Sequence, residues 1–251
     1  MRTRRVEDEG AISAALSRVI GGNGDRRVWS SLARMLSLSA RGAGKGAVFS
    51  GKWLSDLTIQ LAPRIPVRTQ VELEALFHKS GSSLAAELIR DASRKTAIIG
   101  MTAGAVVSAE EFAPPAWLTI PIELVVETLV VGAIEMKLVA ELHATYGVML
   151  GTNEEERGMA MLRCWADGRG LSPAAIASPV ALREALGKKG RAHLVRLVRR
   201  KVAQRLGRNL ATLAPMFVGA VAGAAINRRG TKHLGDRVLS DLIPVVSLPP
   251  A

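Results

Sequence analysis

Long stretches of this chain are apolar around the whole helical circumference rather than along one stripe. Residues 117–134 hold ten Leu, Ile or Val in eighteen positions, and residues 210–226 contain no charged side chain. No stretch alternates strictly enough between apolar and polar residues to predict a strand. Helices are instead predicted over about 84–108, 116–146, 153–168, 190–206, 210–226 and 231–242. The predicted fold class is therefore all-α.

Glycines four residues apart mark two of these helices. Gly100 and Gly104 share one face of the first, and Gly219 and Gly223 share one face of the segment 210–226. A face without Cβ atoms lets a neighbouring backbone approach closely. The sequence thus predicts a multi-helix bundle in which two glycine-rich apolar helices pack against the long central helix, 116–146.

Local signals set several boundaries. Thr69 and Glu72 have the spacing of a capping box, and Gly147 is expected to end the long helix. Two prolines within 62–67 predict an extended segment there. Residues 1–50, interrupted by glycine-rich breaks, are expected to form a loosely ordered extension of a helical domain covering 51–251.

Neither apolar segment is predicted to cross a bilayer. The ten branched aliphatic residues of 117–134 favour insertion by roughly 3–6 kcal/mol, and Glu123 and Glu127 together offset about the same amount. Residues 210–226 span roughly 26 Å at about 1.5 Å per residue, short of a hydrocarbon core of about 30 Å, and contain Pro215. A packed protein helix is favoured for both, with an interfacial position as an alternative for 210–226.

Composition narrows the class of protein further. Apolar residues make up 48% of the chain but aromatic residues only 4%, so the core must consist mainly of small and branched aliphatic side chains. The one cysteine, Cys164, excludes an intramolecular disulfide and is expected to be a buried structural thiol. The N-terminus lacks an uninterrupted apolar segment of the kind found in secretory signals, which predicts a cytoplasmic location. The four histidines are scattered, so no metal or other cofactor is predicted.

Positive charge is concentrated in one place, residues 188–208, which we call the basic segment. The chain has a net charge of +12, and this segment contributes nine basic residues and no acid, leaving only +3 for the remainder. The nine are Lys188, Lys189, Arg191, Arg196, Arg199, Arg200, Lys201, Arg205 and Arg208. Val195, Val198, Val202 and Leu206 give the predicted helix an apolar seam. Such a helix can be a solvated surface helix, can lie on anionic lipid headgroups, or can follow nucleic-acid phosphates.

A second candidate site is a stripe of ionisable residues on the long helix. At about 100° per residue, Glu127, Lys137 and Glu141 all fall within about 40° of Glu123 on one side or the other. One interpretation is a metal or proton site with a raised carboxyl pKa. The other is a stripe that faces solvent or pairs with Arg90, Arg94 or Arg163.

Several of these segments resemble the EcsC-like family of bacterial proteins. The likeness rests on the glycine-spaced helix 97–107, the end of the long helix through Gly147, the segment Met161–Gly168, and residues 214–231. It covers about residues 80–242. The resemblance implies a helical protein that works near a membrane, in a family whose function is largely uncharacterised.

These observations lead to three hypotheses. The first is a non-enzymatic accessory protein that associates peripherally, at the inner face of the cell membrane, with anionic lipid or a membrane-transport partner through the basic segment. The second is an enzyme or metal-binding protein that uses the carboxylate stripe, and the third is a nucleic-acid-binding protein.

Overall fold

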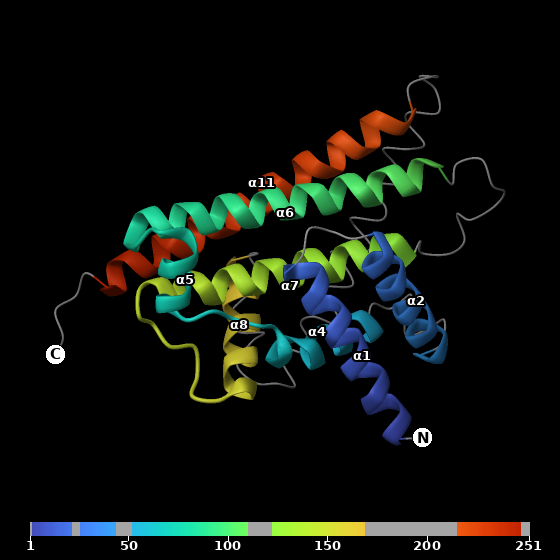
Figure 1. Cartoon of the computed structure of the whole chain (residues 1–251), viewed down its shortest axis with the longest axis horizontal. Coiled ribbons are helices and arrows are strands. Elements are labelled where there is room, and N and C mark those ends of the chain that lie inside the picture. Colours follow the sequence, from blue (N-terminus) through green and yellow to red (C-terminus); the bar gives the residue numbers. More distant parts are fainter. Residues whose placement is uncertain (1, 22–25, 44–51, 110–121, 169–214, 247–251) are drawn as a thin grey trace.

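The computed structural model describes residues 2–21, 26–43, 52–109, 122–168 and 215–246 (Figure 1). These residues form eight α-helices and one short 3₁₀ helix, with no strand among them, so the all-α prediction is confirmed. In chain order the elements are α1 (Arg2–Gly21), α2 (Arg26–Ala43), α4 (Lys52–Leu61), η1 (Ala62–Arg64), α5 (Gln70–Phe77), α6 (Gly81–Ala109), α7 (Ile122–Thr145), α8 (Glu154–Gly168) and α11 (Pro215–Val246).

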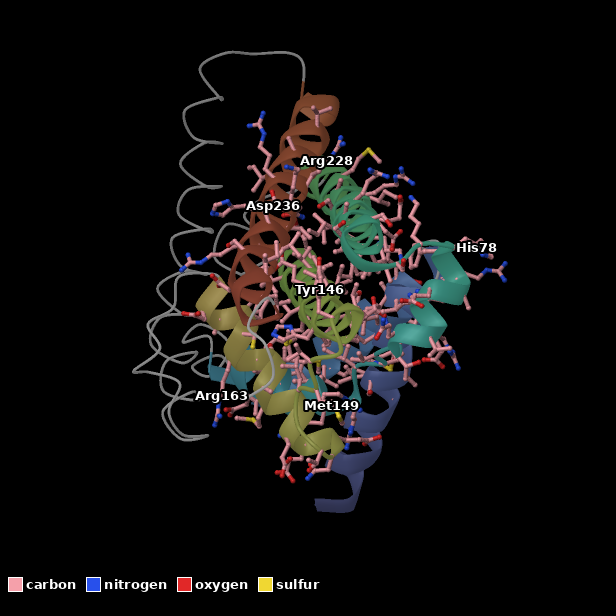
Figure 2. All side chains as sticks on the ribbon, turned by 90° about the vertical axis from the view of Figure 1, so that its left-hand side faces the viewer. His78, Tyr146, Met149, Arg163, Arg228 and Asp236 are labelled. Carbon is pink, nitrogen blue, oxygen red and sulfur yellow. The ribbon has the colours of Figure 1, made fainter. Side chains whose placement is uncertain are left out.

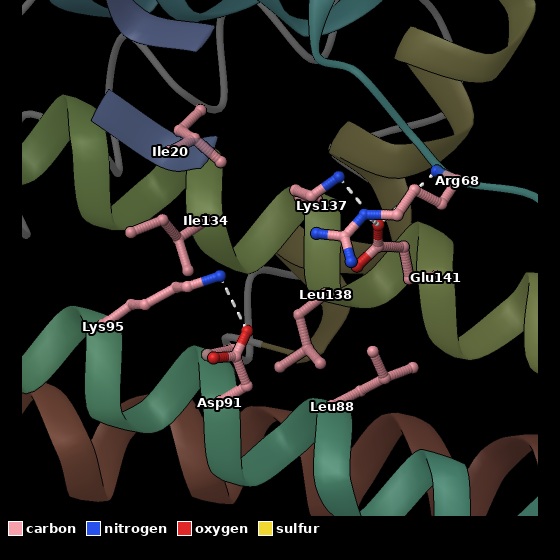
Figure 3. Close-up of a pocket in the computed structure, with 10 residues that line it drawn as sticks. Ile20, Arg68, Leu88, Asp91, Lys95, Ile134, Lys137, Leu138 and Glu141 are labelled. Atoms are coloured by element: carbon pink, nitrogen blue, oxygen red, sulfur yellow. Dashed lines mark hydrogen bonds and ion pairs between the residues drawn. The ribbon is translucent and has the colours of Figure 1, made fainter. Parts of the chain in front are cut away.

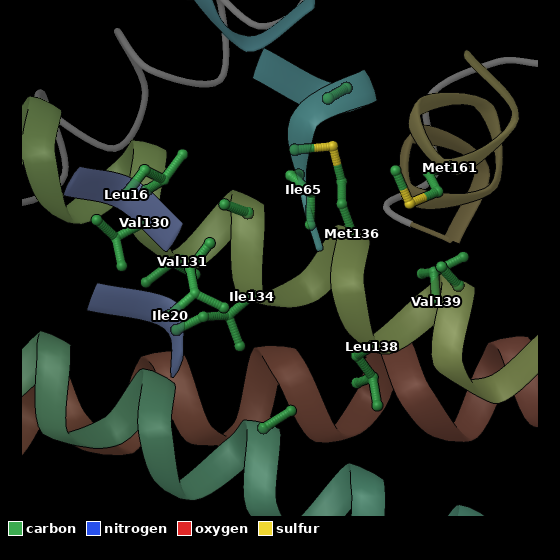
Figure 4. Close-up of a cluster of buried hydrophobic side chains, with 14 of the residues drawn as sticks. Leu16, Ile20, Ile65, Val130, Val131, Ile134, Met136, Leu138, Val139 and Met161 are labelled. Carbon is green, nitrogen blue, oxygen red and sulfur yellow. The ribbon is translucent and has the colours of Figure 1, made fainter. Parts of the chain in front are cut away.

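Helix α7 is the centre of the bundle. It packs against α6, α8 and α11 as well as against the N-terminal helices, and every residue from Leu129 to His143 is buried. Its apolar circumference explains this position, because a helix that is hydrophobic on all sides needs neighbours on all sides. Figure 4 shows Leu16 and Ile20 of α1 beside Val130, Val131 and Ile134 of α7 in the core. The predicted central helix is therefore present from Ile122 onwards, and residues 116–121 lie outside the described ranges.

The end of α7 follows the predicted signal. Gly147 adopts a left-handed backbone with φ +70. The amide of Val148 donates to the carbonyl of His143 at 2.9 Å, and the amide of Gly147 donates to that of Ala144 at 3.0 Å. This pair of bonds is a Schellman motif, which satisfies carbonyls at the helix end.

Helices α6 and α11 form a long antiparallel pair that lies along α7 (Figure 1). Their backbones come together at Gly100 and Gly223: a Cβ placed on either residue would lie 2.5 Å from the carbonyl oxygen of the other. The packing role predicted for these two glycines is confirmed. Gly104 and Gly219 belong to the same helices, but the structure does not describe their surroundings.

The sequence predicted separate helices over 210–226 and 231–242, and the break between them was wrong. Helix α11 is continuous from Pro215 to Val246. Asn227 and Thr231, which sequence reasoning placed at the break, both form side-chain hydrogen bonds to α7. These bonds and the packing against α6 outweigh the local preference for a turn.

The first fifty residues differ from the loosely ordered extension that the sequence predicted. They contain α1 and α2, and these helices place Ile12, Leu16, Leu32 and Leu36 in the core. The sequence did not reveal this contribution for two reasons. Both helices have a polar face, and glycine-rich segments flank α2.

The segment between α4 and α5 runs past one end of α7. It is a 3₁₀ turn at η1 rather than wholly extended, and Ile65, which follows, has an extended backbone. The capping box is present: the Thr69 hydroxyl accepts from the Glu72 amide, and the Glu72 carboxylate accepts from the Thr69 amide at 2.8 Å. This cap fixes the start of α5 and thereby places Arg68 beside α7.

No helix within the described residues has both the length and the apolarity required to cross a membrane.

Candidate functional site

The ionisable stripe of α7 lies inside the protein. The residues Glu127, Lys137 and Glu141 are only 5%, 7% and 4% exposed, so the interpretation of a solvent-facing stripe was wrong for them. Helices pack against α7 on every side, which leaves no face of its central part in water. The side chain of Glu123 lies outside the described part of the structure. The described stripe divides into two groups with different partners.

The first group joins Lys137 and Glu141 to the segment before α5 (Figure 3). The Lys137 ammonium lies 2.7 Å from a Glu141 carboxylate oxygen and donates to the carbonyl of Pro66 at 2.5 Å. Arg68 contacts the same Glu141 oxygen through its Nε atom at 3.3 Å and its backbone amide at 3.4 Å. Its guanidinium also lies 5.9 Å from the centre of the Phe77 ring.

Arg68, the partner of Glu141, is not one of the three arginines that the sequence suggested. Arg90 pairs with Glu87 on its own helix at 2.6 Å, and Arg94 and Arg163 are exposed. Sequence reasoning missed Arg68 because the contact depends on where the segment before α5 crosses α7. The capping box at Thr69 was the available signal, since it fixes the start of α5 directly after Arg68.

Burial changes the protonation chemistry of this group. Removal from water lowers the pKa of Lys137, and the attraction of the Glu141 carboxylate only partly opposes the change. A carboxylate oxygen of Glu141 and the carbonyl of Pro66 take the place of water around the Lys137 amine. A buried ion pair of this kind adds little net stability, because the loss of hydration offsets much of the attraction between the charges.

A small pocket adjoins the Lys137–Glu141 pair (Figure 3). Its charged walls are Arg68, Lys137 and Glu141 together with an Asp91–Lys95 ion pair, whose atoms are 2.7 Å apart. Its volume of about 20 Å³ is room for a single water molecule. The Arg68 Nη1 atom is buried and has no hydrogen-bond partner among the described residues, so it is available to such a water. The pocket therefore suits a solvent molecule and not an organic substrate.

The second group links four helices through two buried carboxylates. Asn227 of α11 donates to Glu127 at 2.8 Å. Glu135, which is fully buried, accepts from Thr231 of α11 at 2.8 Å and from the Trp165 indole of α8 at 2.9 Å. Thr231 also contacts the hydroxyl of Thr96 on α6 at 2.9 Å. These bonds align α6, α7, α8 and α11 in one register.

Glu135 was absent from the sequence-based site. It lies about 120° from Glu123 on the helical wheel, outside the stripe. The sequence did contain a signal for Glu135. A glutamate within an apolar helix requires a buried hydrogen-bond donor, so its presence indicates a polar contact inside the bundle.

His143 and Cys164, two further side chains that can take part in catalysis, are partly or fully withdrawn from water. His143 shares a hydrogen bond of 2.7 Å with the carbonyl of Val139, and burial lowers its pKa. Cys164 is half-buried, and burial raises its thiol pKa, which opposes formation of the reactive thiolate. No group of three or more His, Cys, Asp or Glu side chains in the described ranges is arranged to hold a metal ion.

The basic segment falls entirely within residues 169–214, outside the described ranges. Its binding role and the EcsC-like resemblance are therefore still predictions. Comparison of the chain with protein-family models, with curated proteins and with solved structures finds no match in any of the three.

Proposed function

We propose that this chain is a non-enzymatic, EcsC-like accessory protein that associates peripherally with anionic membrane through the basic segment. The observation that carries the proposal is the distribution of charge. Nine of the basic residues fall within 188–208 without an acid, whereas the other 230 residues together carry a net charge of only +3. A surface of this kind attracts anionic lipid locally rather than through the charge of the whole protein.

The expected strength is moderate. A Lys or Arg close to an anionic membrane surface contributes about 1 kcal/mol, so four or five side chains facing the lipid would contribute roughly 4–5 kcal/mol. That corresponds to reversible binding with a dissociation constant near the millimolar range before any apolar contact is added. Reversible association of this kind is typical of peripheral proteins.

The apolar seam of Val195, Val198, Val202 and Leu206 favours lipid over nucleic acid. These residues recur at helical spacing, so a helix lying on a bilayer can direct them towards the acyl chains while the cations remain at the headgroups. No Phe, Tyr or Trp occurs within 188–208 to stack on bases. Nucleic-acid binding is thus the less favoured use of the same charge.

The environment of the carboxylates on α7 argues against the enzyme or metal-binding hypothesis. Glu141 is held by Lys137 and Arg68, and Glu127 accepts a hydrogen bond from Asn227. These oxygen atoms already have protein donors, and the adjoining pocket accommodates one water molecule. Metal analysis of the purified protein, repeated with Glu127→Gln, tests this directly: a stoichiometric metal that the variant loses would favour the rejected hypothesis.

The docking proposal is tested by co-sedimentation with vesicles of phosphatidylcholine alone and with added phosphatidylserine. The variant Arg196→Glu/Arg199→Glu/Arg200→Glu removes the charge at the centre of the basic segment. A matched control, Arg18→Glu/Arg34→Glu/Arg64→Glu, makes the same change in net charge at three exposed positions of the described helices.

We expect the unmodified protein and the control to sediment with anionic vesicles, and the basic-segment variant to remain in the supernatant. Equal loss in both variants would mean that only net charge matters. Absence of vesicle binding together with tight, salt-sensitive binding to duplex DNA would replace the membrane proposal with the nucleic-acid one.

A further inference from the structure

The paired ends of α6 and α11 expose large apolar side chains to solvent. Met101 on α6 is 47% exposed, and Val221 and Ile226 on α11 are 64% and 48% exposed. The sequence carries no charge between Thr96 and Ala109 or between Pro215 and Asn227, which are the parts of the two helices that lie together at this end (Figure 1). We call these two stretches the apolar end of the α6–α11 pair.

On both helices, exposed cations lie directly next to the apolar end, at the same height along the pair. On α6, the exposed residues Arg90 and Arg94 precede the apolar end. On α11, the exposed residues Arg228, Arg229 and Lys232 follow it (Figure 2, where Arg228 is labelled). Because the helices are antiparallel, the cations of both form one boundary below the apolar side chains.

The contact between the two helices does not require these apolar side chains. The helices meet through backbone atoms at Gly100 and Gly223, and Asn227 is directed towards Glu127 of α7. Met101, Val221 and Ile226 are left on the outside of the pair. Exposed apolar residues at the same end of a helix pair are candidates for contact with another apolar surface.

We propose that the apolar end of the α6–α11 pair enters one leaflet of an anionic bilayer, with Arg94, Arg228 and Arg229 at the level of the phosphates. This inference rests on the proposed membrane association and adds a second, apolar contact to it. Cations beside an apolar surface fit a lipid boundary, where acyl chains lie directly below anionic headgroups.

The lengths of the two stretches limit the angle at which the pair can enter one leaflet. At about 1.5 Å per residue, Thr96 to Ala109 spans about 21 Å and Pro215 to Asn227 about 20 Å. One leaflet contributes about 15 Å of hydrocarbon, and the whole core is about 30 Å thick. A pair along the bilayer normal would therefore extend beyond the near leaflet, whereas a pair inclined by about 45° or more remains within it.

Site-specific fluorescence tests this proposal. In a Cys164→Ala background, Met101→Cys and Val221→Cys are labelled singly with an environment-sensitive fluorophore and mixed with phosphatidylserine-containing vesicles. Val71→Cys is the matched control, because Val71 is an exposed apolar residue on α5, away from the apolar end. Circular dichroism confirms that each labelled protein is folded.

We expect a blue shift and a several-fold rise in emission at positions 101 and 221, quenching by nitroxide on the lipid chains, and no change at position 71. Co-sedimentation with the vesicles while all three labels behave alike would overturn the insertion and leave the docking proposal intact. Absence of co-sedimentation would overturn both proposals. A blue shift without lipid that grows with protein concentration would assign this surface to a second copy of the chain instead.

A second set of variants avoids the label. Met101→Ser/Val221→Ser/Ile226→Ser is expected to weaken vesicle binding at least fivefold in high salt, where charge attraction is screened, and Val71→Ser is expected to leave it unchanged. Equal binding of both variants at high salt would contradict an apolar contact with lipid.

Discussion

Replacing Gly100 with alanine tests how closely α6 and α11 approach each other. A Cβ at this position would lie 2.5 Å from the carbonyl oxygen of Gly223 and 2.6 Å from the side chain of Asn227. The nearest obstacle is backbone, so the two helices must separate to accept the methyl group. Overpacking of this kind costs about 1–3 kcal/mol. Alanine also favours the helix by roughly 0.5–1 kcal/mol relative to glycine, which opposes part of the loss.

Gly132→Ala is the matched control for this substitution. Gly132 is buried within α7, but an added Cβ would meet its nearest neighbour, the Trp165 ring, at 3.9 Å, an ordinary contact. Both variants gain the same helix preference, so the difference between them isolates the close approach. We expect Gly100→Ala to be about 1–3 kcal/mol less stable than Gly132→Ala, or about 2–12 °C lower in Tm at roughly 2–4 °C per kcal/mol. Equal stability in urea and thermal unfolding would refute the backbone contact.

Three further predictions concern buried polar groups. Glu135→Ala leaves the donors of Trp165 and Thr231 without this acceptor, so we expect a loss of roughly 2–6 kcal/mol in urea unfolding and a changed tryptophan emission. Burial lowers the pKa of His143, so as the pH falls below about 6.5 this side chain takes up a proton in the unfolded chain before it does so in the folded protein. The free energy of unfolding should then decline by up to about 1.4 kcal/mol for each unit by which the pH falls. An equal slope in His143→Gln would show that His143 is not the cause of the decline. Because burial raises the thiol pKa of Cys164, a thiol reagent at pH 8 should react much more slowly with the folded than with the urea-unfolded protein.

The helical class and the central element were predictable because both depend on regular patterns. A helix that is apolar on all sides, such as α7, has only one stable place in a bundle, and a glycine such as Gly147 ends a helix through its own backbone freedom. The role of Gly100 and Gly223 in packing was predictable for the same reason. The spacing did not reveal which glycine on α11 would meet Gly100, since that depends on how the two helices align.

The contacts of the ionisable residues were less predictable because they are made between distant segments. Glu141 meets Arg68 across more than seventy positions of the chain, and Glu127 meets Asn227 across one hundred. A helical wheel places Glu127 and Glu141 on one stripe, yet they have different neighbours because different elements cover the two halves of α7. The continuity of α11 through Asn227 was missed for a related reason, since bonds to α7 use the side chains that otherwise favour a break.

Binding of this protein to anionic lipid through the basic segment can be measured as an isotherm on vesicles of stepwise increasing phosphatidylserine content. If several cations contact the lipid surface at once, we expect an affinity that rises steeply with the anionic fraction and falls on addition of salt. An affinity that is the same on neutral and anionic vesicles, or the absence of binding at every composition, would show that the basic segment does not bind anionic lipid.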